Sequence, residues 1–242
     1  MLSKNQTKFI TNLQKKKYRN EQQLFLVEGV KVVEEFLLST IELDTLFCTA
    51  AVEDTYKEYN PTLLTEKELS KISSLSTPNK VLAIFKIPTL TKINSKGLIV
   101  ALDGINDPGN LGTIIRLCEW FGVSQLLCSQ HTVDCYNTKV VQASMGSLAR
   151  LSIQYVNLET VLSNTTLPIY GAVMDGTSIN TKKLAQNGIL IMGSESHGIS
   201  SAIAKFVQHK ITIAKFGITT VTDSLNVATA TAIVLHEFRR DS

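Results

Sequence analysis

The chain has 242 residues, of which 44% are hydrophobic and 19% charged, and its net charge is +3. This is the composition of a globular protein, and the length suits one large domain or two small ones. No apolar run approaches the length of a membrane span, and the N-terminus has no apolar signal core. We therefore expect no membrane association.

The four cysteines form no CxxC pair and no cluster with histidine; they are Cys48, Cys118, Cys128 and Cys135. This spacing disfavours both a disulfide framework and a structural metal site. The sequence therefore predicts a reduced, cytoplasmic protein without a bound metal.

The N-terminal segment, residues 1–20, predicts a helix with Phe9, Ile10 and Leu13 on one side. It contains no acidic residue, and its basic residues are Lys4, Lys8, Lys15, Lys16, Lys17 and Arg19. A basic end of this kind can follow a phosphate backbone, and a solvated terminus looks the same.

A small α/β unit follows. Its expected strands are 24–27, 45–49 and 81–85, its expected helices 30–38 and a segment after Thr65. Thr65 and Glu68 have the spacing of a capping box. The polar segment 88–96 predicts a linker, so we expect domains at 1–90 and 91–242.

The second domain alternates strands and helices again. The expected strands are 98–102, 125–128, 152–156, 169–173, 189–192 and 210–214. The expected helices are 113–121, 139–147, 158–163, 200–206 and 225–238. This order predicts a mostly parallel sheet with helices on both faces.

The most informative stretch is 103–116, DGINDPGNLGTIIR, directly after the strand 98–102. Its glycines and asparagines predict a loop with special backbone needs, followed by a helix from about Gly112. Arg116 lies about 200° round the helical wheel from Ile114, off the apolar stripe. Alone, the pattern also fits an ordinary βα connection with a solvated arginine.

Two further polar loops follow expected strands. Gly193 to Gly198 places Glu195 between two glycines, and His197 is assigned no role. In the third loop Asp223 and Ser224 predict the cap of a last helix that is apolar on nearly every side. Arg239 and Arg240 would complement that helix's dipole. Neither loop has the spacing of a Walker or dinucleotide-binding motif.

Together these motifs resemble the SpoU (TrmH-type) RNA 2′-O-ribose methyltransferases of the SPOUT superfamily. The resemblance rests on three motifs in order: Asn110 followed by Arg116, Gly193–Gly198, and Ser224-Leu225-Asn226-Val227. The central stretch 134–146 matches the family too. The N-terminal part, with Tyr18-Arg19 and Phe25–Gly29, resembles the family's substrate-binding domain, which is similar to a ribosomal protein fold.

The resemblance implies a deep trefoil knot in the second domain. It also implies bound S-adenosyl-L-methionine, with Gly193, Ile213 and Leu225 lining the cofactor pocket, and a homodimer formed through the C-terminal domain. The chain departs from the family pattern at Ala214-Lys215 and in a longer loop at 216–223.

The implied reaction methylates a ribose 2′-hydroxyl in structured RNA, with guanosine one candidate nucleotide. The implied catalytic residues are Arg116, Asn110, Glu195, Ser224 and Asn226. Because a guanidinium keeps its proton, we expect Arg116 to bind a phosphate and lower the hydroxyl's pKa rather than act as a base. Asn110 would orient Arg116 or the ribose, Glu195 would fix Arg116 or the loop, and Ser224 and Asn226 would complete the pocket.

Ribosomal RNA is favoured over transfer RNA, since the basic end and the small first domain suit a large structured substrate. The alternatives are the same reaction on transfer RNA, a catalytically lapsed RNA-binding relative, and a Rossmann-type enzyme, which the missing fingerprint disfavours.

Overall fold

The computed structural model describes residues 2–89, 92–94, 96–181, 183–217 and 224–240. The chain forms two compact units: Met1–Thr89 with Asp134–Arg150, and Leu90–Val133 with Leu151–Ser242. The segment 134–150 thus packs with the first unit, although the sequence places it inside the second expected domain, 91–242. A division of the chain at one point, such as the expected boundary near residue 90, cannot place this segment in the first unit.

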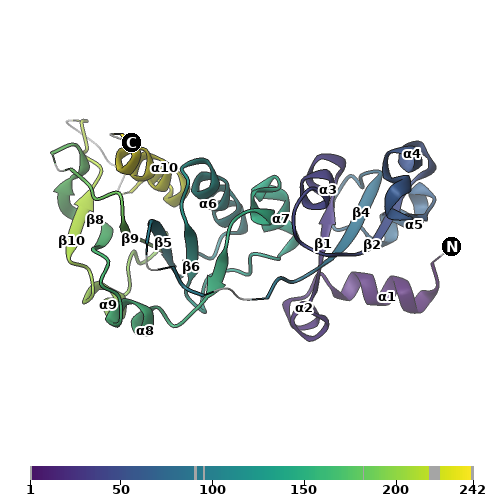
Figure 1. Ribbon diagram of the computed structural model, residues 1–242, viewed down its shortest axis with the longest axis horizontal. Helices are drawn as coiled ribbons and strands as arrows, with labels where there is room; N and C mark the ends of the chain where they lie inside the picture. Colours follow the sequence, from purple (N-terminus) through teal and green to yellow (C-terminus); the bar gives the residue numbers. More distant parts are fainter. Residues whose placement is uncertain (1, 90–91, 95, 182, 218–223, 241–242) are drawn as a thin grey trace. The chain divides into compact units, whose positions relative to one another are not determined.

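The first unit is built on a four-stranded mixed sheet (Figure 1). Its strands, in spatial order, are β1 (Leu24–Glu28), β4 (Val81–Lys86), β2 (Leu43–Cys48) and β3 (Thr62–Leu63). Strand β4 is antiparallel to β1 and β2, and β3 is parallel to β2. The short strand β3 was not expected from the sequence, because two residues carry no periodicity.

The described residues of this unit form six α-helices. They are α1 (Lys4–Asn12), α2 (Lys16–Gln22), α3 (Val30–Leu37), α4 (Glu53–Tyr56), α5 (Glu66–Ile72) and α7 (Thr138–Ser144). Short 3₁₀ turns lie at Ala50–Val52, Lys57–Tyr59 and Ser147–Ala149. The capping box of α5 is confirmed: Glu68 N–H donates to Thr65 Oγ1, and Thr65 N–H donates to the Glu68 carboxylate.

The single helix expected over residues 1–20 is wrong, because the chain forms α1 and α2 with a break at Leu13. Leu13 is completely buried, and its carbonyl accepts a hydrogen bond from Arg19 Nη1 at 2.9 Å. In a continuous helix this carbonyl would accept from the backbone N–H four residues on, so its bond to the Arg19 side chain accompanies the break. Tertiary contacts therefore decide the break.

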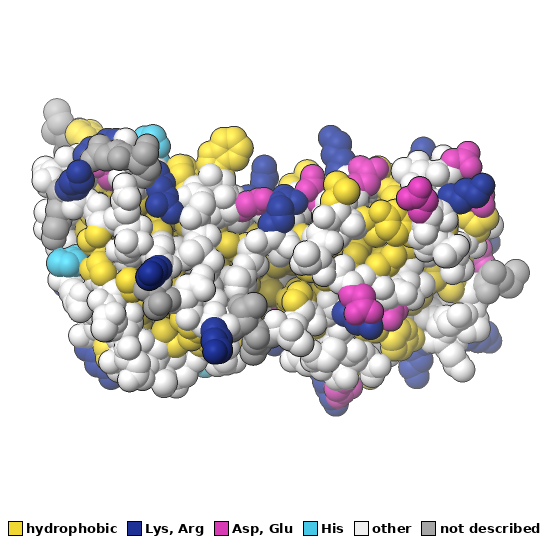
Figure 2. Space-filling view, in the orientation of Figure 1, with side chains coloured by type: hydrophobic (Ala, Val, Ile, Leu, Met, Phe, Trp, Pro, Cys, Tyr) yellow, Lys and Arg dark blue, Asp and Glu magenta, His cyan; other side chains and the backbone are white. Residues whose placement is uncertain are grey.

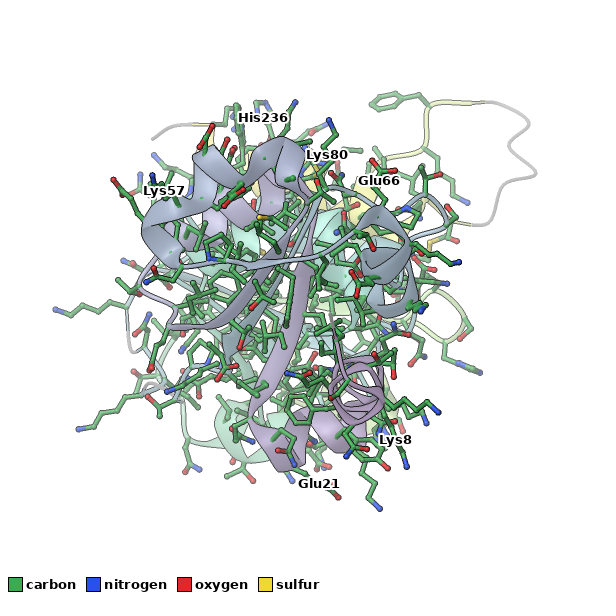
Figure 3. All side chains as sticks on the ribbon, turned by 90° about the vertical axis from the view of Figure 1, so that its right-hand side faces the viewer. Lys8, Glu21, Lys57, Glu66, Lys80 and His236 are labelled. Carbon is green, nitrogen blue, oxygen red and sulfur yellow. The ribbon has the colours of Figure 1, made fainter. Side chains whose placement is uncertain are left out.

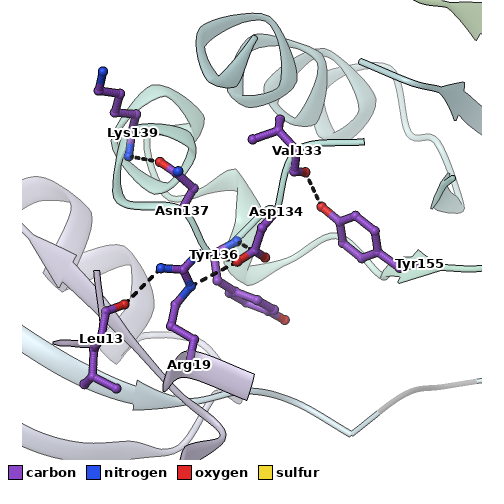
Figure 4. A network of polar contacts seen from close by, with 8 residues as sticks. All are labelled: Leu13, Arg19, Val133, Asp134, Tyr136, Asn137, Lys139 and Tyr155. Carbon is purple, nitrogen blue, oxygen red and sulfur yellow. Dashed lines mark hydrogen bonds and ion pairs between the residues drawn. The ribbon is translucent and has the colours of Figure 1, made fainter. Parts of the chain in front are cut away.

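Arg19 joins the two segments of the first unit (Figure 4). Its Nε donates to Asp134 Oδ2 at 3.0 Å, and its Nη2 bonds the same carboxylate. Arg19 is only 1% exposed, so this ion pair is shielded from solvent. Tyr136 adds an aromatic contact to Phe25, with ring centroids 4.6 Å apart. These contacts hold the start of segment 134–150 against α2 and β1.

The second unit contains a six-stranded sheet. The spatial order is β10 (His209–Thr212), β8 (Ile169–Ser178), β9 (Gly188–Gly193), β5 (Leu98–Asp103), β6 (Gln125–Cys128) and β7 (Ile153–Tyr155). All of these described pairings are parallel. The expected parallel sheet is confirmed, with strand ends shifted by a few residues.

Helices cover both faces of this sheet, as expected (Figure 1). One face carries α6 (Pro108–Trp120) and α10 (Val227–Arg239), which pack against each other. The other carries α8 (Leu158–Ser163) and α9 (Ser201–Ala204), and a 3₁₀ turn lies at Ile179–Thr181. Alternate residues of β5, Ile99 and Ala101, enter the core cluster that contains Leu158 and Ile203.

The four cysteines, all among the described residues, are buried and form no disulfide. Burial raises the pKa of the Cys118 and Cys128 thiols, which keeps them protonated and unreactive. None of the helices in the described ranges is both long and apolar enough to cross a membrane.

The strand order brings two of the sequence motifs together. From β5 the chain steps to β6 and β7 on one side, whereas β9 lies on the other side of β5. Asp103 and Gly193, the last residues of β5 and β9, are direct neighbours in register. Ligands of open parallel sheets bind at the carboxyl ends of strands where the order reverses. The edge beyond Asp103 and Gly193 is such a position.

Candidate active site

The first motif lies at the start of α6. Asp107 is the N-cap, and its Oδ1 accepts a hydrogen bond from Asn110 N–H at 2.8 Å. Pro108 occupies the first turn, where its missing N–H needs no partner. The helix expected from about Gly112 therefore begins earlier than predicted. The Asp-Pro cap determines the start, and the glycines that suggested a loop lie inside the first turns.

The second motif is a tight turn after β9. Ser194 N–H donates to the Gly198 carbonyl at 3.0 Å, and Gly198 N–H donates to the Ser194 carbonyl at 2.9 Å. A Cβ on Gly193 would lie 2.1 Å from the Gly198 carbonyl carbon, so no other residue fits there without moving the backbone. Glu195 sits exposed within this turn.

The third motif lies at the start of α10. The expected cap at Asp223 and Ser224 is wrong for this helix: its N-cap is Asn226, whose Oδ1 accepts from Ala228 N–H and Thr229 N–H. Residues 218–223, which include Asp223 and most of the loop 216–223, lie outside the described residues. Ser224 is described and exposed, and makes no hydrogen bond with any described residue.

Three of the predicted residues form one hydrogen-bonded chain. Asn226 Nδ2 donates to Asn110 Oδ1 at 2.9 Å, and Asn110 Nδ2 donates to Glu195 Oε1 at 2.6 Å. We call Asn226, Asn110 and Glu195 the amide relay. It ties the start of α10, the first turn of α6 and the turn after β9 to one another.

The direction of every bond in the amide relay is fixed. Asn226 Oδ1 is committed to the N-terminus of α10, so its amide nitrogen must face outward as a donor. Asn110 must then present its oxygen to Asn226 and its nitrogen to Glu195, and the ionised Glu195 accepts only. The Glu195 carboxylate thus marks the negative end of the relay.

Arg116 stands apart from this chain. It is exposed on α6, and its guanidinium has no hydrogen-bond or ion-pair partner in the described part of the protein. Neither Asn110 nor Glu195 forms a hydrogen bond with Arg116. Glu195 is bonded to Asn110 instead, so of its two predicted roles the glutamate fixes the loop. A free cation on the helix that carries Asn110 is available to an anionic group.

The three expected cofactor residues come from two places. Gly193 is the last residue of β9, whereas Ile213 and Leu225 lie before and after residues 218–223 of the third loop. Gly193 and Ile213 are half-buried, and Leu225 is 49% exposed next to Asn226. Partly exposed apolar side chains and a glycine backbone are of the kind that pack against the flat face of an adenine ring. The described residues contain no group of three or more His, Cys, Asp or Glu that could hold a metal.

Several residues that position the site were missed by sequence reasoning. Asp103 Oδ2 accepts from Ser200 N–H at 2.8 Å and joins the end of β5 to the start of α9. Arg239 donates to the carbonyls of Phe121 and Gly122, each at 2.8 Å. It therefore complements the C-terminus of α6 rather than only its own helix. The Asp-Pro dipeptide at 107–108 was the one visible signal for the start of α6.

A parallel α/β sheet with polar loops joined at its carboxyl edge is the arrangement in which open-sheet α/β proteins bind their ligands. The chain belongs to the SpoU rRNA Methylase family, whose family model matches residues 97–236. A second model, the MRM3-like substrate binding domain, matches residues 4–83. The family resemblance inferred from the three motifs is thereby confirmed.

Relatives and solved structures agree. The 23S rRNA (guanosine(2553)-2′-O)-methyltransferase RlmP of Bacillus subtilis is 27% identical and covers 94% of this chain and 93% of its own. A structure from Porphyromonas gingivalis assigned to the TrmH family of RNA methyltransferases is 37% identical, with a TM-score of 0.90 and full coverage of both chains. An AdoMet-bound rRNA methyltransferase from Sinorhizobium meliloti is 30% identical, with a TM-score of 0.87 and coverage of 99% and 96%.

Two variants of Asn226 separate its capping role from its place in the relay. Asn226→Ala removes both, and we expect a loss of about 1 kcal/mol of unfolding free energy. Asn226→Asp keeps an acceptor for the N-terminus of α10 and should be nearly as stable as the wild type, but it no longer donates to Asn110. Urea unfolding measures the stability difference.

Both variants should speed amide hydrogen exchange in the turn 193–198, because Asn110 loses its fixed orientation toward Glu195. Unchanged exchange in the stable Asn226→Asp protein would show that the relay does not hold this turn.

Proposed function

We propose that this protein transfers a methyl group from S-adenosyl-L-methionine to a ribose 2′-hydroxyl of ribosomal RNA. The amide relay is the observation that carries the proposal. It gathers Asn110, Glu195 and Asn226 at one strand edge and leaves the exposed Arg116 on the same helix as Asn110. A lapsed relative could keep Asn226 as the cap of α10, but that role does not explain Asn110, Glu195 or an exposed Arg116 without an ion-pair partner among the described residues.

When bound, S-adenosyl-L-methionine supplies a methyl group attached to a positively charged sulfur. A nucleophile can take this methyl group, and S-adenosylhomocysteine is then the leaving group. A ribose 2′-hydroxyl is a weak nucleophile until its proton is lost, and in the proposed reaction that proton passes to solvent water. Arg116 is a very poor base, because guanidinium stays protonated. We therefore assign Arg116 to binding a phosphate of the RNA and stabilising negative charge on the 2′-oxygen.

The other residues serve position. Holding two reactants in line can contribute roughly 7–11 kcal/mol. The amide relay supports this alignment because it fixes the first turn of α6. Arg116 lies further along the same helix. Gly193, Ile213 and Leu225 are assigned to the cofactor, and Ser224 to the ribose contacts. The first unit is assigned to RNA binding, and the knotted path remains a prediction for the second unit.

The direct test is transfer of a labelled methyl group to total ribosomal and transfer RNA, followed by mapping of alkali-resistant positions. We expect label in ribosomal RNA at a 2′-O-methylated nucleotide, with guanosine the first candidate because of the Bacillus subtilis relative. Label found in transfer RNA alone would show that the substrate is transfer RNA and not ribosomal RNA. S-adenosylhomocysteine binding without any transfer would indicate a lapsed relative.

Arg116→Lys tests the phosphate-binding role. Lysine keeps the charge but loses the two-pronged geometry, so we expect kcat to fall about 10- to 100-fold, the equivalent of one charge-assisted bidentate contact. S-adenosylhomocysteine affinity should not change. Arg150→Lys, at an exposed pair with Glu35, is the matched control. Near-normal turnover of Arg116→Lys would refute the two-pronged contact.

We also propose a homodimer formed through α6 and α10, and a cytoplasmic location. Trp120 on α6 is 84% exposed, and Ile233 on α10 is 37% exposed. Large apolar side chains left bare on two packed helices favour a protein interface. We take a second copy as the occupant, in line with the homodimer that the family resemblance implies, and Trp120 and Ile233 are the apolar side chains that it would cover.

Sedimentation equilibrium should show a dimer that Trp120→Glu converts to monomer. Leu38→Glu, at an equally bare leucine (85% exposed) of the first unit, should remain dimeric. A dimer that survives Trp120→Glu would place the interface elsewhere.

A further inference from the structure

The basic N-terminal segment is a folded element. Helix α1 opens with a complete capping box, in which Ser3 and Gln6 exchange side-chain and backbone hydrogen bonds. Ile10 and Leu13 are buried in the same core cluster as Leu69 of α5. The lysines of this segment are therefore carried on a surface with a defined shape, which a solvated tail would not provide.

The structure divides the basic residues of this segment into two groups. Arg19 is buried and fully used by Asp134 and the Leu13 carbonyl, so it is a structural residue. The remaining five are exposed on or beside α1 and α2; we call them the lysine face, and they are Lys4, Lys8, Lys15, Lys16 and Lys17. Of the six basic residues in this segment, the five of the lysine face are therefore the ones that a partner can contact.

Three of the five residues of the lysine face are poorly neutralised. No acidic residue lies within residues 2–20, and the nearest along the chain, Glu21, makes a weak exposed pair with Lys17 at 3.8 Å. Within the described residues, Lys4, Lys8 and Lys15 have no ion-pair partner. Uncompensated positive charge on a fixed surface attracts a polyanion.

The rest of the first unit is different. Lys57 is followed directly by Glu58, and Lys67 stands between Glu66 and Glu68. Figure 2 shows acidic and basic side chains mixed over α4 and α5. Figure 3 shows Lys8 and Lys57 on opposite sides of this unit. Lys57 and Lys67 thus each have an acidic neighbour in sequence, whereas residues 2–20 contain none. Glu68 of α5, which packs against α1, lies close to the backbone of Leu2 and is the acidic side chain that faces the start of that helix.

Two aromatic rings lie among the lysines. Phe9, next to Lys8, is 40% exposed, and the Tyr18 ring is 5.8 Å from Lys15 Nζ. Tyr18 is half-buried, so Phe9 is the ring on which a base can stack. Lysines beside an exposed aromatic ring are typical of single-stranded RNA recognition.

We propose that the lysine face binds the phosphate backbone of the RNA substrate and so recruits it to the enzyme. The inference rests on the proposed function, because it takes the substrate to be RNA. Lys4 and Lys8 are one helical turn apart, roughly 6 Å along α1, so both can reach one strand. The face acts on RNA affinity and takes no part in methyl transfer.

The test compares two triple variants with the same loss of charge. Lys4→Gln, Lys8→Gln and Lys15→Gln together alter the lysine face; Lys57→Gln, Lys67→Gln and Lys71→Gln together alter other exposed lysines of the same unit. Binding to unmodified 23S ribosomal RNA transcribed in vitro is measured over a range of KCl concentrations. The slope of log K against log[salt] should flatten by about 2 in the first variant and little in the second.

In methyl transfer, the lysine-face variant should show a KM for RNA raised about tenfold or more, with kcat and S-adenosylhomocysteine affinity unchanged. Equal salt slopes for the wild type and both triple variants would overturn the inference. A wild-type protein that transfers no methyl group to any RNA would refute the proposed function instead, and the salt slopes would still report on the lysine face.

Discussion

The amide relay from Asn226 through Asn110 to Glu195 is the constraint on which the site depends. Asn226 is committed as the cap of α10, and that commitment fixes the direction of each following bond. Two helix starts and one turn are thereby held in a single arrangement. An exposed chain of this kind contributes modest stability, since solvent competes for each bond. Its value lies in the fixed orientation it gives to neighbouring groups.

The sheet makes this relay feasible. Because β5 and β9 are parallel neighbours, the loops after both strands emerge at one edge, with Asp103 beside Gly193. Close approach is equally necessary: Gly193 lies so near the backbone of Gly198 that a side chain would force the turn open. Arg239 then anchors the far end of α10 to the C-terminus of α6. The two helices that carry Asn110 and Asn226 are therefore tied at both ends.

Sequence reasoning was accurate where a local pattern is strong. Apolar runs predicted the central strands β5 and β9 of the second unit, and the Thr65–Glu68 spacing predicted a true capping box. It was inaccurate at helix starts. Gly112 suggested a loop, yet Asp107 and Pro108 begin α6 earlier; Ser224 suggested a cap, yet Asn226 is the cap. Ser, Asp and Asn all cap helices well, so propensity alone does not choose among adjacent candidates.

Periodicity and turn chemistry are local properties, so the class of fold, the three polar motifs and the residue types available for chemistry follow from the order of the amino acids. Which of those residues touch depends on how the chain folds. The tertiary structure joined Asn110 to Glu195 and Asn226 and left Arg116 free. It also withdrew Arg19 from the basic surface into a buried pair with Asp134. Contacts between residues more than eighty positions apart depend on strand order and packing, which no local pattern encodes.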